Sequence, residues 1–271
     1  MSNRTVWLCV CAVLVVGVAA SVHRLTAAPA PARSAVVVEL FTSEGCSSCP
    51  PADDVLTRLA LKQLTPDVDV IALGEHVDYW DRLGWRDPFS SAAFSARQST
   101  YDDHAFHRNE VYTPQLVVDG QYEQVGSDVT AVRRAIARAA QAQKATVAVT
   151  VTRAPASGDL RVDVRADAPP TLAVRDRVDV IVAVTEDNLV TDVRRGENRG
   201  RTLKHSAVVR YLAAAGTWSP ESSASATSIS VPWQANWKAA YVRVIGFLQE
   251  HESRRIVGAG FATLDEPAGT H

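Results

Sequence analysis

Cys46 and Cys49 stand two residues apart in the segment EGCSSCPPAD, residues 44–53. The remaining two cysteines of the sequence both lie within residues 1–20. A disulfide-stapled domain would need more cysteines spread along the chain, and a bridge across so short a loop adds little stability. A zinc site would usually require two more clustered Cys or His residues. The pair therefore favours redox chemistry, in which one thiolate attacks a disulfide and the other resolves the mixed disulfide.

The elements around the pair would position it for that role. Residues 34–43 form an apolar run that predicts a buried parallel strand, and residues 51–64 have helical periodicity. Backbone N–H groups and the dipole at a helix N-terminus stabilise a nearby thiolate. We therefore expect Cys46 to attack, to be more exposed than Cys49, and to have a pKa below the free value of ~8.5. Pro50 and Pro51 delay the helix, so the expected lowering is moderate.

The rest of the chain changes its pattern near residue 144. Before this point, the periodicity predicts a strand, a helix, a hairpin turning at Asp119-Gly120 and an amphipathic helix, at residues 68–77, 90–109, 115–126 and 128–143. After it, alternating apolar and polar residues predict short strands at residues 145–153, 159–167, 176–187, 228–233, 241–250 and 255–264. A series of short strands is typical of an antiparallel β-sandwich, which we expect at residues 144–266.

Thr113-Pro114 precedes the expected hairpin. In this position the dipeptide resembles the cis-proline of the thioredoxin fold, which faces the cysteine pair and offers backbone to a bound peptide. The order strand, Cys-x-x-Cys, helix, strand, helix, Thr-Pro, hairpin and helix resembles that fold over about residues 34–143. The resemblance implies an α/β thioredoxin-like domain at residues 35–143, with a central mixed sheet flanked by helices. It also implies that Pro114 is part of the exchange site and that Thr113 lies beside it.

Four segments carry a closer resemblance: VVVELFTSEGCSSCPPAD, HVDYWDRLGW, VYTPQLVVDG and RRGENRG. In these the chain is similar to the bacterial family named "domain of unknown function 1223", exported proteins with a thioredoxin-like domain. The family name implies no particular activity. The sequence lacks the Trp-Cys-Gly-Pro-Cys of thioredoxin itself, so the resemblance does not imply a redox potential or a partner.

Two further segments carry candidate residues. His76, Trp80 and Trp85 lie in residues 74–89, which leave a strand end where α/β proteins place their sites. They would bind a substrate peptide, with His76 as a proton shuttle, or the tryptophans would only pin a long loop. Residues 194–206 (RRGENRGRTLKHS) read either as a solvated hairpin end or as a recognition loop whose arginines pair with carboxylates.

The first 34 residues predict the destination of the protein. Arg4 followed by an apolar run and a Val-Ala-Ala exit is typical of a secretory signal at residues 1–20, with an uncleaved membrane anchor as the alternative. Residues 21–34 read as a Pro/Ala tether. The protein is thus expected to be exported, periplasmic or secreted, and to touch a membrane only if the leader stays attached. A formal net charge of -2 argues against nucleic acid as a partner.

The leading hypothesis is a thiol–disulfide oxidoreductase that acts on the thiols or disulfides of another exported protein. Cys46, Cys49 and Pro114 would be its catalytic residues. It would need no cofactor or metal beyond the redox-active Cys46–Cys49 disulfide. The alternative is a binding module without catalysis, either a copper carrier that uses the two thiolates or an adaptor that binds partners through the β-sandwich.

Overall fold

The computed structural model describes residues 35–155, 157–222 and 226–264. The expected signal or anchor at residues 1–20 and the tether at residues 21–34 lie outside this part of the chain. Among the described residues, no helix has both the length and the apolar character needed to cross a membrane.

The first half forms the elements that periodicity predicts, in the predicted order. They are β1 (Val36–Thr42), α1 (Pro50–Ala60), β2 (Val70–His76), α2 (Ala92–Tyr101), β3 (Gln115–Val118), β4 (Tyr122–Val125) and α3 (Val129–Ala139). A 3-10 turn (Asp81–Leu83) follows β2 and a π-helical turn (Asp102–Phe106) follows α2. β1 pairs with β2 in parallel and with β3 antiparallel, so β1 is central and is buried throughout.

The second half consists of strands. They are β5 (Ala145–Arg153), β6 (Leu160–Asp167), β7 (Val178–Glu186), β8 (Leu189–Asp192), β9 (Thr202–His205), β10 (Val208–Trp218), β11 (Thr227–Val231), β12 (Val242–Glu250) and β13 (Ile256–Thr263). Short 3-10 turns occur at Pro220–Ser222 and Ala239–Tyr241. β8 and β9 form a hairpin of their own, which sequence periodicity did not reveal.

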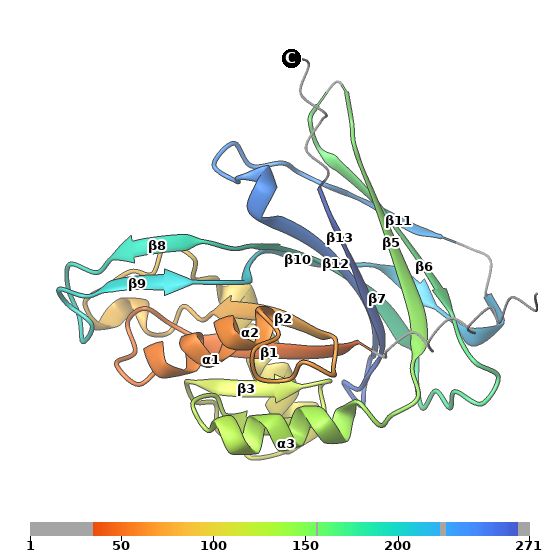
Figure 1. Ribbon diagram of the computed structural model, residues 1–271, viewed down its shortest axis with the longest axis horizontal. Helices are drawn as coiled ribbons and strands as arrows, with labels where there is room; N and C mark the ends of the chain where they lie inside the picture. The colour runs from red at the N-terminus through yellow and green to blue at the C-terminus, as the bar shows by residue number, and fades with distance from the viewer. Residues whose placement is uncertain (1–34, 156, 223–225, 265–271) are drawn as a thin grey trace, which may run out of the picture. The chain divides into compact units, whose positions relative to one another are not determined.

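The expected fold class is wrong. The structure is mostly β, and one mixed sheet of eleven strands runs through both halves in the order β11-β6-β5-β13-β12-β7-β10-β2-β1-β3-β4. It is therefore not a helix-flanked thioredoxin-like domain followed by a separate antiparallel β-sandwich. The junction is β10, which pairs with β7 along its length and meets β2 in parallel at Val208 and Gly74. Figure 1 shows the strands turning from β1, β2 and β3 to the steeply inclined β5 and β6.

A shared core explains why the halves do not separate. Alternate residues of β1 point to opposite faces, and α1 and α3 cover the face that carries Val36, Val38 and Leu40. On the other face, Val37 packs with residues of both halves. This cluster joins Ile71, Leu73 and Phe94 to Ile181, Ala183, Val209, Ile245, Phe247 and Ile256. β7 and β12 are buried on both faces, because Ile181 and Ile245 pack in this cluster while Val182 and Val244 pack in a second cluster on the opposite face.

Candidate functional site

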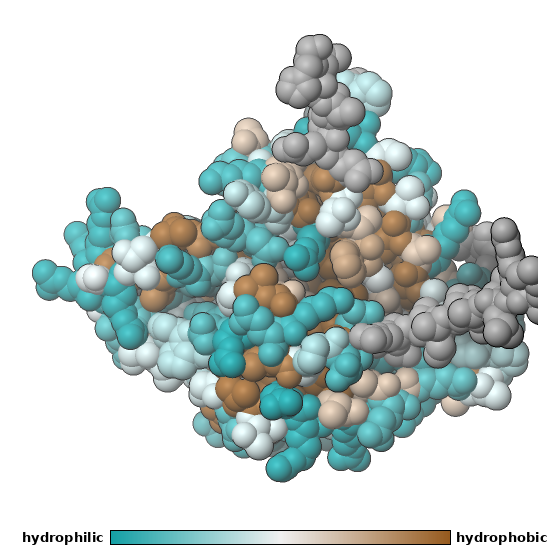
Figure 2. Space-filling model, viewed as in Figure 1, coloured by the Kyte–Doolittle hydropathy of each residue, from teal (hydrophilic) through white to brown (hydrophobic). Residues whose placement is uncertain are grey.

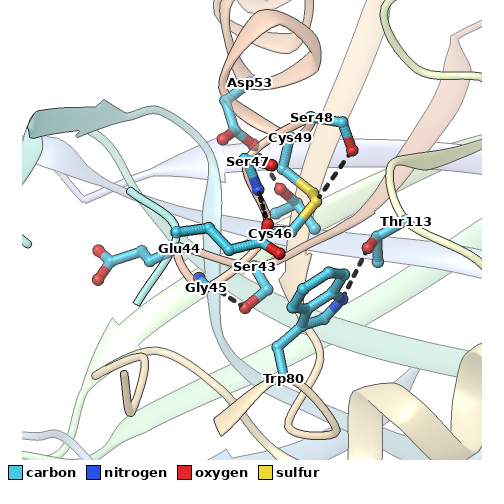
Figure 3. Close-up of a disulfide and its surroundings, with 12 residues drawn as sticks. Ser43, Glu44, Gly45, Cys46, Ser47, Ser48, Cys49, Asp53, Trp80 and Thr113 are labelled. Atoms are coloured by element: carbon cyan, nitrogen blue, oxygen red, sulfur yellow. Dashed lines mark hydrogen bonds between the residues drawn. A yellow bond between two sulfur atoms is a disulfide. The ribbon is translucent and has the colours of Figure 1, made fainter. Parts of the chain in front are cut away.

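The two cysteines form a disulfide in the turn between β1 and α1 (Figure 3). Cys49 is the N-cap of α1, so the predicted position at the start of the first helix is confirmed. The turn is closed by the Cys49 N–H, which donates to the Cys46 carbonyl over 3.2 Å. The Ser48 hydroxyl lies 3.3 Å from the Cys46 sulfur.

Both cysteines are fully buried, with 0% of either residue exposed, so the expected greater exposure of Cys46 is wrong. Ser47 and Ser48 between them are exposed. Trp80 and Thr113 lie beside the disulfide, and the indole N–H of Trp80 donates to the Thr113 hydroxyl over 2.8 Å (Figure 3). A partner thiol could reach the sulfurs only after a local movement of these neighbours.

The start of α1 offers few donors to a thiolate. Pro50 and Pro51 occupy its first two positions and have no N–H. The N–H groups of Ala52 and Asp53 both donate to the Cys49 carbonyl. The free N–H groups on which the expected lowering of the Cys46 pKa depended are therefore absent from this turn. The Ser48 hydroxyl is a donor that contacts the Cys46 sulfur directly.

The Thr113–Pro114 bond is cis, as predicted. Pro114 is buried directly before β3, and its carbonyl accepts the Gly126 N–H over 3.0 Å. A Cβ on Gly126 would lie 3.5 Å from the Cβ of Pro114 and 2.9 Å from that of Ala52. Only a glycine fits between them, and this close packing brings Pro114 next to the first turn of α1.

Next to the turn that carries the disulfide, the structure buries a set of titratable side chains, which we call the acid–histidine cluster. Its members, none more than 8% exposed, are Glu44, Asp53, His76, Asp87 and His205. They come from the β1–α1 turn, α1, the end of β2, the loop after β2, and β9. Isolated buried charges are costly, so each member needs partners within the protein.

The cluster is held together by short hydrogen bonds. His76 Nδ1 lies 2.6 Å from Asp87 Oδ2, which also accepts the Glu44 N–H. The Glu44 carboxylate contacts His205 Nε2 at 3.1 Å and accepts the Trp85 indole N–H at 2.8 Å. The two imidazole rings stand edge to face, with centroids 5.0 Å apart. Both histidines therefore have a carboxylate partner.

Asp53 is the member nearest to Cys49 along the chain. It follows Cys49 by one helical turn, and its carboxylate accepts a hydrogen bond from the Thr42 hydroxyl at 2.8 Å. Burial raises the pKa of Asp53, and the attraction of His205 and His76 offsets this only in part. Asp53 can therefore hold a proton at a higher pH than an exposed aspartate does.

The other two shifts match an ion pair between His76 and Asp87. Burial by itself lowers the pKa of His76, but the carboxylates of Asp87, Asp53 and Glu44 together outweigh burial, so the net pKa is raised. Burial by itself raises the pKa of Asp87, but His76 and backbone N–H groups outweigh burial, so the net pKa is lowered. A charged His76 paired with an ionised Asp87 is the favoured state.

The hairpin of β8 and β9 fastens this site from the second half of the chain. The buried side-chain amide of Asn198 donates to the carbonyls of Glu44 and Cys46, at 2.9 Å each. The Glu197 carboxylate accepts the Ser47 N–H at 2.9 Å. Hydrogen bonds from the side chain and the backbone N–H of Ser47 lower the pKa of Glu197. Residues about 150 positions from the cysteines therefore shape the loop that carries them.

Two of the residues predicted for the site, Thr113 and Trp80, lie beside the disulfide that Cys46 and Cys49 form. His76 is buried in the acid–histidine cluster, and Trp85 supports that cluster through Glu44. The prediction did not assign Asp87 or His205 to the site. The only sequence signal for the hairpin's part in it was the segment RRGENRG.

The described residues contain no group of three or more His, Cys, Asp and Glu side chains arranged to hold a metal ion. In the acid–histidine cluster, the nitrogens that face the carboxylates are engaged in hydrogen bonds.

Comparisons with known proteins assign the chain to a family. The sequence model of the family described as "Protein of unknown function (DUF1223)" matches residues 37–249, which include the disulfide and the β8–β9 hairpin. The chain belongs to the DUF1223 family. A comparison with curated protein sequences found no match for this DUF1223 protein.

Two solved structures are similar to this DUF1223 protein. The X-ray structure of protein AGR_C_4864 from Agrobacterium tumefaciens is 30% identical, with a TM-score of 0.62, over 87% of this chain and 97% of that chain. HBP35 of Porphyromonas gingivalis has a TM-score of 0.63 and 16% identity, over 88% of this chain and 78% of that chain. At that identity the second similarity concerns the fold alone.

Proposed function

We propose that this DUF1223 protein is an exported thiol–disulfide exchange protein that acts on another exported protein. The observation that supports this best is the Cys46–Cys49 disulfide at the start of α1, set against the buried acid–histidine cluster. A disulfide with a merely structural role would have little use for five buried titratable neighbours. Export is proposed from the leader pattern of residues 1–20.

The exchange starts from the disulfide form. A thiolate of the partner attacks the Cys46 sulfur, a new sulfur–sulfur bond forms, and the Cys46–Cys49 bond breaks with its electron pair on Cys49. A second partner thiolate then attacks the partner's own sulfur in the mixed disulfide and releases Cys46. The partner ends oxidised by two electrons and the cysteine pair reduced, and the reverse sequence reduces a partner disulfide.

Asp53 is the group we assign to proton transfer with Cys49. It lies one helical turn away, it is buried, and its raised pKa lets it carry the proton that the leaving Cys49 sulfur needs. Thr42 orients its carboxyl group through a hydrogen bond. His76 influences this proton through its charge, since it lowers the pKa of Asp53.

The remaining site residues would receive the partner. Pro114 and Thr113 would line the path to the disulfide, and Trp80 would move aside when a partner segment arrives. Trp85 would act indirectly, because its indole N–H is bound to Glu44. The chemistry needs no cofactor other than the disulfide.

The deciding experiment traps the intermediate. The reduced Cys49→Ser variant is mixed with a peptide disulfide, and the mixed disulfide with Cys46 is measured by mass spectrometry. It should accumulate, because no resolving thiol remains, whereas Cys46→Ser should form far less. Equal trapping by both variants, or none by either, would rule out the assigned roles.

One observation favours a second candidate, a binding module without catalysis. Both cysteines are fully buried, which is what a clasp that only shapes a binding surface requires. If the protein is an adaptor of this kind, the Cys46→Ser variant should bind partners as well as the wild type does. A copper carrier that uses the thiolates would instead show metal-dependent protection of both thiols from alkylation.

A further inference from the structure

Besides Arg201, whose guanidinium group donates to the Asn198 side chain, five arginines stand on the two loops that contact the cysteine turn. Arg82 and Arg86 belong to the loop after β2, and Arg194, Arg195 and Arg199 belong to the turn of the β8–β9 hairpin. All five are exposed. We call them the arginine collar. In Figure 2 the projecting end of this hairpin, at the left of the view, is mostly hydrophilic.

The two loops are fixed to each other. Gly84 and Gly196 both have positive φ angles, +106° and +74°, which favour glycine. A Cβ on Gly84 would lie 3.8 Å from the Gly196 Cα, and a Cβ on Gly196 would lie 3.1 Å from that of Trp85. Glu197 and Asn198 fasten the same turn to Ser47 and Cys46. The two loops that carry the collar are therefore held against each other, and the hairpin turn is held against the cysteine turn.

The collar has no acidic partners of its own. Among the described residues, none of its five side chains lies within ion-pair distance of a carboxylate, unlike Arg108, Arg177 and Arg255 elsewhere on the surface. The carboxylates on the same two loops have other partners. Asp81 accepts from Ser90 and the Asp87 N–H, and Glu197 accepts from Ser47. Five arginines without an ion-pair partner thus gather on a chain whose net charge is -2.

We propose that the arginine collar is the docking surface for an acidic polypeptide segment of the exchange partner. This inference rests on the proposed function. The guanidinium group binds carboxylates through two parallel hydrogen bonds, and complementary charge speeds the encounter of two proteins. A protein partner fits better than a membrane or a nucleic acid, because both loops of the collar hydrogen-bond to the turn that carries the disulfide, and the reaction partner of that disulfide is a protein sulfur.

The test measures binding apart from redox chemistry. Fluorescent peptides without cysteine, one rich in Asp and Glu and one rich in Lys, are titrated with the oxidised protein, and fluorescence anisotropy is recorded. The triple variant Arg194→Glu, Arg195→Glu, Arg199→Glu is compared with Arg133→Glu, Arg134→Glu, which reverses two exposed arginines on α3. The triple variant should bind the acidic peptide about tenfold more weakly or worse. The control should bind like the wild type, and added salt should weaken the wild-type complex.

Two outcomes would overturn the collar's assignment. One is equal binding of the acidic peptide by the triple variant and the wild type, or no preference of the wild type for the acidic over the basic peptide. The other is collar-dependent sedimentation with phosphatidylglycerol vesicles without peptide binding, which would assign the surface to a membrane. Exchange of the reduced wild type with uncharged 2-hydroxyethyl disulfide is measured in parallel. A protein that binds the acidic peptide through the collar but does not exchange would refute the proposed function and leave the docking surface standing.

Discussion

Asp53 connects the burial of a single carboxyl group with both stability and proton transfer. Desolvation raises its pKa above the ordinary value of 3.8, so the folded state binds the proton more tightly than the unfolded chain does. The contribution of this proton to the stability of the folded state is complete below pH 3.8 and is lost as the pH rises through the folded-state pKa of Asp53. The protein therefore keeps a group at this site that lowers its stability at neutral pH, which a functional role would explain.

Replacing Asp53 with asparagine tests both effects. Asparagine can still accept the Thr42 hydrogen bond but cannot ionise, so Asp53→Asn should be more stable than the wild type at pH 7. The difference should shrink toward pH 3. Urea unfolding of the oxidised proteins at pH 3, 5 and 7 measures it. In the same variant, exchange with a peptide disulfide should slow and lose its pH dependence in the range where Asp53 titrates. A stability difference that is constant with pH would show that the carboxyl group does not titrate as described.

At the scale of elements, the β8–β9 hairpin is the part that completes the site. Its turn supplies Asn198 and Glu197 to the cysteine loop, and β9 supplies His205 to the acid–histidine cluster. β9 also contacts α1. A short hairpin with four residues in each strand would be marginal by itself, so its contacts with the cysteine loop stabilise both partners.

Asn198→Ala should loosen the cysteine loop. The substitution leaves the Glu44 carbonyl without its side-chain donor, which costs about 1–3 kcal/mol for a buried polar group, and leaves the Cys46 carbonyl with only the Cys49 N–H. Lower stability in urea and faster reduction of the disulfide by dithiothreitol are expected. Gln141→Ala, at an exposed position after α3, serves as the control and should change neither quantity. Unchanged reduction of Asn198→Ala would mean that the hairpin does not govern access to the disulfide.

Across the whole molecule, a buried ionic network crosses the boundary between the halves. Arg97 of α2 donates to Glu39 of β1 at 2.6 Å and to Gln249 of β12 at 3.1 Å. Glu75 is fully buried and neither of its carboxylate oxygens has a hydrogen-bond partner. Burial and the nearby Glu39 raise the pKa of Glu75 well above its ordinary value, so beside the Arg97–Glu39 pair Glu75 holds its proton to a higher pH than an exposed glutamate does.

Arg97→Leu should therefore destabilise the protein by about 3–5 kcal/mol, because it leaves the Glu39 charge buried and unpaired. Glu75→Gln should raise stability at pH 7, since it removes a carboxyl group that ionises less readily in the folded protein than in the unfolded chain. Urea unfolding measures both variants. Arg133→Leu, at an exposed position, is the control for losing one arginine. A loss no larger than that of the control would mean that Arg97 is not needed for the fold.

The single sheet also predicts how the isolated first half behaves. A fragment of residues 35–143 would expose Val37, Ile71, Leu73 and Phe94, which pack on the second half in the complete protein. We expect it to bind a hydrophobic dye such as anilinonaphthalene sulfonate and to lack a cooperative thermal transition, both measured beside the complete chain. A fragment that unfolds sharply as a monomer would show that the shared core is dispensable.

Much of the local structure could be predicted from the sequence. The apolar run at residues 34–43, the helical spacing after Pro51 and the alternation after residue 144 correspond to β1, α1 and the strands β5 and β6. The fold class was wrong because the same alternation was taken to mean a separate sandwich. The runs VDVIVAVT and VRVIGFLQ in β7 and β12 are nearly continuous, and this is the pattern of strands buried on both faces.

By itself, the sequence determined which residues could take part in a reaction and which elements carry them, because periodicity and turn residues act over short distances. Cys46 and Cys49 at the start of α1 are such a case. Only the tertiary structure decided what surrounds the disulfide. His205 is 161 residues from the Glu44 that it contacts, and Asn198 is 152 residues from the Cys46 that it holds. These contacts depend on how β10 joins the two halves at β2, and on the apolar faces that meet there, which no local pattern encodes.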